Sequence, residues 1–504
     1  MTTRRGPATP VVAALDVGTS SVRALLYDAL ASPVAGAEVH LPYRPRVGPD
    51  GTAEVDARRL LALVERALDQ LLRGRRVEVL GVGLSTFWHG LLGLDRLGEP
   101  ATPLWLWSDS RSWSQAESLR RRLDADAVHQ RTGCPIHPSY WPSKLAWAGP
   151  GSAPRWSSFG DFLFLKLFGE WGTSISMASA TGLFSLRGVD WDRDLLDRLR
   201  VRPRQLPPLA GTRRGLRPAY ARRWPALAGA PWVPAAGDGG LANLGSGCVD
   251  PSLRALTVGT SGALRVITDR LPRHLPRELW CYRLDAERLV LGGSFSNGGN
   301  LHAWVMENFR LDEGALERRL RQMAPASTGL VFVPLLAGER SPGFAARASG
   351  AIAGLTLATT AVDIARAGLE AIAVDFARVD RSLDRVAPGA RSLVGSGAGL
   401  LASPAWMQIM ADAIGKPLVA GEGREASSRG AAILVLEHLG RHDEGQRRPP
   451  RGRTFRPRAE AHRAYRSAAA LQERLYRALV VDRLVDTSVP AHLQLRGRKR
   501  SNGG

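Results

Sequence analysis

Apolar residues along the chain occur in short runs that end at glycine or a polar residue, and in longer stretches with helical spacing. Val77–Leu84 and Pro231–Ala236 are mostly apolar runs that predict buried strands. Leu60–Leu72, which follows a candidate N-cap at Asp56, and Ala361–Leu383 predict helices. The alternation of the two patterns indicates α/β domains, in which ligands bind where the strands end.

The alternation continues in the second half of the chain and stops at a segment of different composition. Arg391–Val394 predicts a strand that runs into the glycine-rich turn Gly395–Gly399, and Trp406–Ile414 predicts the helix after it. Arg441–Arg458 is rich in Arg and Pro and predicts a loop, and the chain beyond about Pro490 is expected to be a disordered tail.

An internal repeat links the two halves. Leu15–Asp28 and Leu256–Asp269 both have an apolar strand, a Gly-Thr-Ser turn, a second apolar strand and a final Asp. Each predicts a hairpin, and the recurrence predicts duplicated domains that face each other. The backbone N–H groups and hydroxyls of such turns can hold phosphate, and two ordinary hairpins without a ligand are the alternative. The candidate phosphate-binding residues are Gly18, Thr19, Ser20 and Ser21 in the first turn, and Gly259, Thr260 and Ser261 in the second.

Length and composition favour a globular protein of two or three domains. The 504 residues are 44% hydrophobic, enough for two cores, and no apolar run is long enough to span a membrane. The N-terminus does not resemble a secretory signal, and the three cysteines have no metal-ligand spacing. We therefore expect a cytoplasmic protein without a membrane partner.

The net charge of +21 has two interpretations. It could mark a nucleic-acid or membrane surface, or it could follow from the Arg-rich composition that GC-rich coding produces. Only four positions are Lys and the Arg residues are mostly scattered, so we expect no nucleic-acid partner. A positive field would still favour anionic ligands such as ATP or a sugar carboxylate.

Several polar residues stand where α/β proteins place their chemistry. Asp16 ends the first strand and could orient Mg²⁺ on phosphates, or it could only stabilise the turn. Asp238 follows a strand, is flanked by glycines, and could accept a proton from an attacking hydroxyl, or cap the next helix. No Walker A or clean Rossmann pattern is present. A candidate sugar pocket, from aromatic and polar clusters after strands, comprises Trp88, His89, Asp109 and Arg111.

Taken in order, these segments resemble the FGGY family of carbohydrate kinases, from about Val11 to Leu439. The matching segments are Asp16-Val17-Gly18-Thr19-Ser20-Ser21, Trp88-His89-Gly90, Asp109 and Arg111 in a Trp-x-Asp-x-Arg pattern, Lys144-Leu145, Ala178-Ser179-Ala180-Thr181-Gly182, Gly237-Asp238-Gly239, Gly259-Thr260-Ser261-Gly262, Gly338-Glu339-Arg340-Ser341-Pro342 and Gly395-Ser396-Gly397-Ala398. The resemblance implies two actin-like (ribonuclease H-like) ATPase domains with a cleft between them, at residues 1–250 and 251–440. Residues 441–504 would form an Arg/Pro-rich loop, a C-terminal helix and a tail.

The resemblance also implies the cofactors and the roles. ATP with Mg²⁺ would donate the phosphoryl group, Asp16 would serve the metal, and Asp238 would be the base and contact the substrate. Gly299, Gly397, Ala398 and Ser403 would lie near the nucleotide. The partner would be a small sugar or sugar acid, and a homodimer is one candidate oligomeric state.

Departures from the family pattern bear on the substrate. Phe87 stands where xylulose kinases usually have Gln, and Trp280–Arg283 with Ser296–Asn300 looks most like gluconate kinases. Arg111 or Arg340 could pair with a carboxylate. We therefore expect gluconate or a related sugar acid. A xylulose, other pentulose or polyol kinase is the alternative within the family, and an actin-like ATPase without sugar transfer is the alternative outside it.

Overall fold

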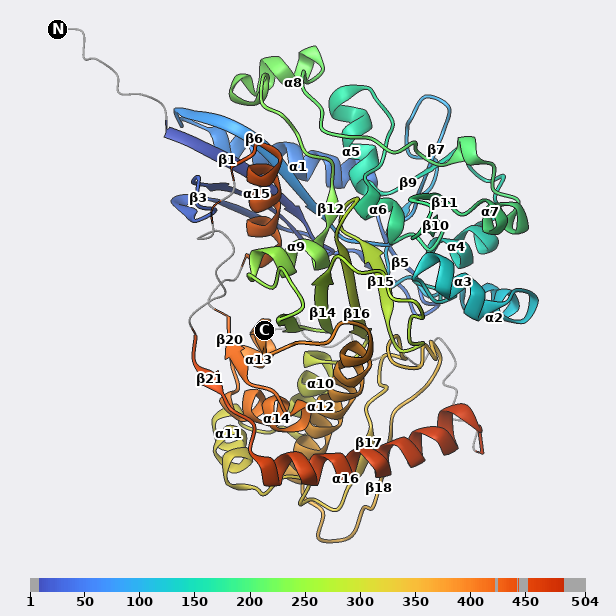
Figure 1. Ribbon diagram of the computed structural model, residues 1–504, viewed down its shortest axis with the longest axis vertical. Coiled ribbons are helices and arrows are strands. Elements are labelled where there is room, and N and C mark those ends of the chain that lie inside the picture. The colour runs from blue at the N-terminus through green and yellow to red at the C-terminus, as the bar shows by residue number, and fades with distance from the viewer. Residues whose placement is uncertain (1–8, 422–424, 442, 444–451, 485–504) are drawn as a thin grey trace, which may run out of the picture.

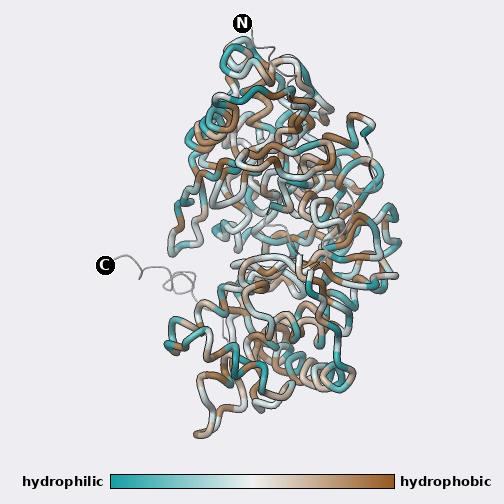
Figure 2. The backbone as a smooth tube through the Cα atoms, turned by 90° about the vertical axis from the view of Figure 1, so that its left-hand side faces the viewer, coloured by the Kyte–Doolittle hydropathy of each residue, from teal (hydrophilic) through white to brown (hydrophobic). Residues whose placement is uncertain are grey.

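The computed structural model describes residues 9–421, 425–441, 443 and 452–484. Two halves lie one above the other, with the N-terminal half at the top of Figure 1 and the C-terminal half below it. Hydrophobic stretches run through both halves (Figure 2). Within the described residues, no helix has the length and apolar character needed to cross a membrane.

The N-terminal half is organised around a five-stranded sheet in the order β12-β6-β1-β2-β3. β1 pairs antiparallel with β2, β2 antiparallel with β3, and β6 runs parallel to both β1 and β12. The sheet strands and the helices named below are β1 (Thr9–Val17), β2 (Ser21–Tyr27), β3 (Pro33–Pro42), β6 (Val77–Thr86), β12 (Ala236–Gly237), α1 (Ala57–Leu72), α5 (Phe159–Phe168), α6 (Ile175–Ser179) and α9 (Asp238–Gly245).

Shorter elements extend this half beside the sheet. They are β4 (Arg46–Val47), β5 (Ala53–Val55), β7 (Leu92–Leu94), β8 (Leu104–Trp105), α2 (Trp113–Arg122), α3 (Ala125–Thr132), α4 (Trp141–Ala148), β9 (Arg155–Ser157), β10 (Phe184–Ser185), β11 (Asp190–Trp191), α7 (Arg193–Leu199) and α8 (Pro218–Arg223).

The C-terminal half repeats this topology in a seven-stranded sheet of order β15-β16-β14-β13-β19-β20-β21. β13 and β14 form the antiparallel hairpin, β16 pairs antiparallel with β14, and β19 runs parallel to both β13 and β20. The strands are β13 (Leu253–Val258), β14 (Gly262–Thr268), β15 (Trp280–Arg283), β16 (Leu289–Phe295), β19 (Ser392–Ser396), β20 (Leu418–Ala420) and β21 (Thr454–Phe455). The predicted repeat is thus confirmed at the level of strand order and direction.

The remaining elements of this half are mostly helical. They are α10 (Gly299–Phe309), α11 (Glu313–Gln322), β17 (Val331–Val333), β18 (Ala351–Ala353), α12 (Ala361–Val386), α13 (Ala398–Leu401), α14 (Pro404–Ile414), α15 (Ala426–His438) and α16 (Ala459–Tyr476).

Helix α15 crosses from the C-terminal half of the chain to the N-terminal sheet, beside β1 and β6 in Figure 1. Its buried face, Ala431–Leu436, belongs to the same apolar cluster as β1, β2 and β6. Glycines let it approach closely, because a Cβ at Gly83 would overlap the backbone of Ala431. Residues 251–440, expected as one domain, are therefore divided between the two halves in space.

Most predicted elements are confirmed, with differences at two places. Asp56 caps α1, accepting hydrogen bonds from the backbone N–H groups of Arg58 and Arg59 at 2.8 and 3.3 Å. The predicted strand Pro231–Ala236 is mostly irregular, because only its end pairs regularly with β6. Helix α9 begins at Asp238 itself, so Asp238 does not occupy the N-cap position that was one of its two predicted roles. The tail beyond Pro490 and much of the predicted loop Arg441–Arg458 lie outside the described residues.

Candidate active site

A cavity of about 1090 Å³ lies between the halves, where the strands of both sheets end. The lining residues from the first half include Asp16, Arg23, Glu38, His40, Trp88, His89, Trp107, Asp238 and Gly239. Those from later in the chain include Thr257, Ser261, Gly262, Arg265, Trp280, Tyr282, Ser294, Arg340, Ser396, Gly397, Ala398 and Glu425. Both hairpins therefore contribute to one cavity, the first through the strand residues Asp16 and Arg23 and the second through Ser261 and Gly262.

Asp16 is the penultimate residue of β1 and is 7% exposed. The hydroxyl of Ser85 on β6 donates to its Oδ1 at 2.7 Å, and Arg23 lies 3.7 Å from its Oδ2. Burial raises the pKa of this carboxyl, while Ser85 and Arg23 act in the opposite direction. The carboxylate is thus held at the edge of the cavity beside the first turn.

Asp238 is the first residue of α9, and Gly237, not Asp238, occupies the N-cap position. Its Oδ1 accepts a hydrogen bond from the backbone N–H of Gly239 at 2.8 Å. Burial and the nearby charge of Asp16 raise its pKa to about 6, and Arg265 opposes this rise. A carboxylate with a pKa near 6 is suited to accept a proton at neutral pH.

Glycines on both sides of Asp238 are required by the packing of Trp88. A Cβ at Gly237 would overlap the pyrrole edge of the indole, and one at Gly239 would press on its six-membered ring. The two glycines therefore let the backbone on either side of Asp238 pack against the indole of Trp88, which forms an aromatic wall of the cavity. This explains in physical terms why small residues surround the predicted base.

Aromatic side chains from both halves form one end of the cavity. Trp280 and Tyr282 stack at 4.2 Å between ring centroids, and Trp88 meets Tyr282 edge-on at 5.0 Å. The guanidinium of Arg340 lies 4.3 Å from the ring centroid of Trp107. Faces of this kind pack on sugar C–H groups, while the cation can pair with an anionic group.

His89 lines the same end of the cavity in a left-handed backbone conformation, with φ of 66°. Its Nδ1 lies 2.6 Å from the carbonyl oxygen of Ala180. Burial lowers the pKa of the imidazole to about 3, so it is neutral at pH 7; its one N–H is then donated from Nδ1 to Ala180, which leaves Nε2 as an acceptor. The ammonium of Lys144 donates to the carbonyl of His89 at 3.1 Å and to those of Leu106 and Ser139, holding these loops together.

The second turn is packed against two further glycine-containing segments. Gly299 donates its N–H to the carbonyl of Gly259 at 2.8 Å, and Asn300 donates to the carbonyl of Thr260 at 3.0 Å. A Cβ at Gly397, whose φ is +94°, would overlap the carbonyl of Val258. The predicted nucleotide residues Gly259, Gly299 and Gly397 are thus brought together, and Gly397 among them lines the cavity.

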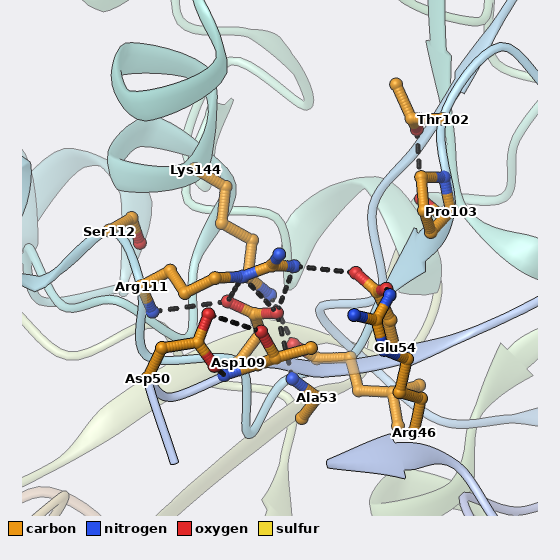
Figure 3. Close-up of polar contacts among 12 residues, drawn as sticks. Arg46, Asp50, Ala53, Glu54, Thr102, Pro103, Asp109, Arg111, Ser112 and Lys144 are labelled. Carbon is orange, nitrogen blue, oxygen red and sulfur yellow. Dashed lines mark hydrogen bonds and ion pairs between the residues drawn. The ribbon is translucent and has the colours of Figure 1, made fainter. Parts of the chain in front are cut away.

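Asp109 and Arg111 are placed differently from the expectation that they contact the substrate. Arg111 Nη2 donates to Asp109 Oδ2 at 2.6 Å and to Glu54 Oε2 at 2.8 Å (Figure 3). Asp109 Oδ2 also accepts the backbone N–H of Ala53 at 3.0 Å, and the guanidinium lies over Trp147. These groups satisfy each other and are not among the residues that line the cavity.

Ser403 is also engaged elsewhere. Its hydroxyl donates to Glu317 Oε2 at 2.6 Å and accepts the backbone N–H of Trp406 at 3.0 Å as the N-cap of α14. Gly18, Thr19 and Ser20 flank the cavity beside Asp16 without lining it, and Ser21 is buried at the start of β2. Roles for these residues at a nucleotide stay predictions.

Sequence analysis missed several lining residues. Arg265 lies three residues after the second Gly-Thr-Ser-Gly turn, and the alternation of side chains along β14 was the only available signal. Tyr282 and Trp280 appeared only as part of a resemblance and not as candidate pocket residues. Glu38 and His40, on edge strand β3, carry no local motif.

The two duplicated α/β halves, joined across a cleft that residues of both hairpins line, define a two-domain actin-like fold. Comparison with known families agrees: residues 11–245 match the N-terminal domain of the FGGY family of carbohydrate kinases, and residues 255–436 match its C-terminal domain. The chain belongs to this family, and it is a carbohydrate kinase that transfers phosphoryl groups to an alcohol acceptor.

Individual relatives share this organisation over most of their length. The chain is 30% identical to the gluconokinase of Bacillus subtilis (strain 168), over 85% of this chain and 88% of the relative. The solved gluconate kinase from Lactobacillus acidophilus superposes with a TM-score of 0.86 at 26% identity, covering 94% of this chain and 99% of the other. The ligand-bound xylulose kinase from the same organism also gives 0.86 at 26% identity, covering 93% and 98%.

Proposed function

We propose that this kinase phosphorylates gluconate or a closely related sugar acid, with ATP as donor. The observation that carries the proposal is Arg340, a cation at the aromatic end of the cavity. No carboxylate of the described residues lies within ion-pair distance of it, and its buried Nε has no hydrogen-bond partner there. An acceptor carboxylate would neutralise it. The similarity to two gluconate kinases supports the same choice.

In this proposal Asp238 is the general base. Its carboxylate would accept the proton of the attacking hydroxyl while that oxygen bonds to the γ-phosphorus of ATP. Trp88, His89 and Tyr282 would hold the carbon chain of the acceptor. The turns at Gly18 and Gly259, with Gly299 and Gly397, would hold the nucleotide.

The residues at the site suit Mg²⁺ better than a metal that is coordinated by several protein side chains. No group of three or more His, Cys, Asp or Glu residues that could hold a metal occurs in the described part of the chain. Mg²⁺ usually takes one or two carboxylates, substrate phosphates and several waters, and Asp16 at the cavity edge suits that mode. The ion, when bound, would neutralise charge on the phosphates.

A screen of ADP release tests the function. We expect turnover with gluconate and much less with glucitol, which has the same carbon chain without the carboxylate. Arg340→Gln should raise KM for gluconate at least tenfold, as expected for loss of a charged hydrogen bond, and should leave glucitol turnover nearly unchanged.

Asp238→Asn should abolish transfer, with a loss on the order of a thousandfold, and should spare nucleotide binding.

Other outcomes would point to the alternatives. Preference for a pentulose or polyol over gluconate would favour a xylulose or polyol kinase, which the similarity to a xylulose kinase keeps open. ATP hydrolysis that no sugar stimulates would favour an actin-like ATPase. A homodimer remains a prediction, which sedimentation of the purified protein would test.

A further inference from the structure

Arg265 is a buried cation in the cavity that lacks a carboxylate partner. It projects from β14, lines the cavity, and is only 7% exposed. Its Nε donates to Asn243 Oδ1 at 3.1 Å, and its Nη2 donates to Thr257 Oγ1 at 3.0 Å. Within the described residues, no carboxylate lies at ion-pair distance and Nη1 has no hydrogen-bond partner. The guanidinium is therefore held by two neutral groups from opposite halves of the molecule.

Two other buried arginines of the chain, which do not line the cavity, do have carboxylate partners. Arg254, which is fully buried, forms ion pairs with Asp380 and Asp384, and Arg366, 2% exposed, pairs with Glu370. Arg23, which also borders the cavity, pairs with Glu425 at 3.2 Å. Burying an unpaired charge is costly, so a fixed guanidinium without a counter-ion implies that an anionic ligand completes the site.

The neighbours of Arg265 indicate which part of the ligand it meets. Thr257 is the residue before the end of β13, and its hydroxyl lies 2.9 Å from that of Ser396, next to Gly397. On the other side, Arg265 acts electrostatically on Asp238. Arg340 lies over Trp107 at the aromatic end, and its charge also interacts with Asp238 and with Arg265. Arg265 thus lies between the predicted base and the turns predicted to hold phosphate.

We propose that Arg265 binds the phosphoryl group during its transfer and stabilises the charge on its oxygens. The proposal rests on the proposed kinase mechanism. The acceptor O–H proton goes to Asp238, the acceptor oxygen bonds to the γ-phosphorus, and the bond from that phosphorus to the bridging oxygen breaks, so ADP leaves with the electron pair. Donors fixed before the reaction stabilise such charge without reorganisation.

The hydrogen bond to Asn243 links Arg265 to the base as well as to the phosphate-binding turns. Asn243 lies on α9, the helix that begins with Asp238, so one side chain of the C-terminal half is tied to the element that carries the base. Arg265 also lowers the pKa of Asp238 and so favours the ionised, proton-accepting form. Removing the cation should therefore change both the rate of transfer and its pH dependence.

Three variants test the proposal: Arg265→Gln, Arg265→Lys, and Arg270→Gln as a control, because Arg270 is exposed just beyond the end of the same strand. For Arg265→Gln we expect kcat with gluconate to fall roughly hundredfold to thousandfold, with KM for gluconate changed less than about threefold. Lys keeps a charge but not the planar fork, so Arg265→Lys should recover part of kcat. Arg270→Gln should behave like the unchanged protein.

Binding measurements supply a readout that does not depend on turnover. Calorimetry would compare the affinity for MgADP with and without aluminium fluoride, in the presence of gluconate. The unchanged protein should gain affinity from the fluoride complex, and Arg265→Gln should lose that gain while binding MgADP alone as before. The acid limb of kcat/KM should also move to higher pH in Arg265→Gln.

The proposal is overturned if Arg265→Gln keeps kcat, or if it raises KM for gluconate without lowering kcat, since the residue would then bind the acceptor. If Arg265→Gln does not fold, Arg265→Lys decides by the same criteria. Lack of activity on gluconate in the unchanged protein would overturn the proposed substrate alone. The variants would then be compared with whichever acceptor the screen finds.

Discussion

At the scale of single residues, the candidate site depends on the balance of charges around Asp238. Burial and Asp16 raise the pKa of this carboxyl to about 6, and Arg265 restrains the rise. Since a general base must be ionised, kcat/KM should fall as pH decreases through about 6. A pH–rate profile between about pH 4.5 and 8 measures this limb. Activity that stays constant down to pH 5 would contradict the assignment.

Ionisation of the Asp238 carboxyl should lower the free energy of unfolding of the protein. Its pKa in the folded protein lies above the ordinary value for an Asp side chain, so the folded form binds the proton more tightly and stability decreases as pH rises from about 4 to about 6. Asp238→Asn should then be about 1 kcal/mol more stable at pH 7.5, a figure reduced because the group borders the solvent-filled cavity. Thermal melting at pH 7.5 and pH 5 tests this, and the gain should be smaller at pH 5.

At the scale of elements, the contact between α9 and α15 fixes the position of the predicted base. The two helices meet at glycines, because a Cβ at Gly430 would overlap the carbonyl oxygen of Leu241 and one at Gly245 would overlap that of Ala426. Backbone groups cannot yield as a flexible side chain can. The close approach therefore determines where α9 begins and where the carboxylate of Asp238 projects.

Gly430→Ala should separate the two helices. We expect a loss of about 1–3 kcal/mol in the free energy of unfolding, from overpacking, and a lower kcat because the start of α9 shifts. Gly314→Ala in α11 is the matched control, since its added Cβ would meet only ordinary contacts and Ala favours a helix over Gly by up to about 1 kcal/mol. Equal melting temperatures for the two variants would show that the helix contact is not tight.

At the scale of the whole molecule, sequence patterns predicted the duplicated sheets because hairpin, glycine turn and strand are local features. That the two halves face each other followed from the repeat, and the cleft between them followed from the resemblance to the FGGY family. Patterns could not show that Arg111 is neutralised by Asp109 and Glu54, because partners far apart in sequence decide whether a charge is free. They also could not show that Arg265, without a motif of its own, reaches Asn243 across the cleft.

The path of α15 has a consequence for attempts to divide the protein. A fragment of residues 1–250 would leave bare the apolar surface of β1 and β6 that Ala431–Leu436 cover. We expect this fragment to aggregate when produced alone, and to regain solubility and kinase activity when produced together with residues 251–504. Yield in the soluble fraction and ADP release measure both effects. A fragment that stays monomeric and folded by itself would contradict this expectation. If the fragment does aggregate, a cut after residue 250 divides one shared core between two polypeptides. Neither piece would be stable alone, and the two would become stable only by associating with each other.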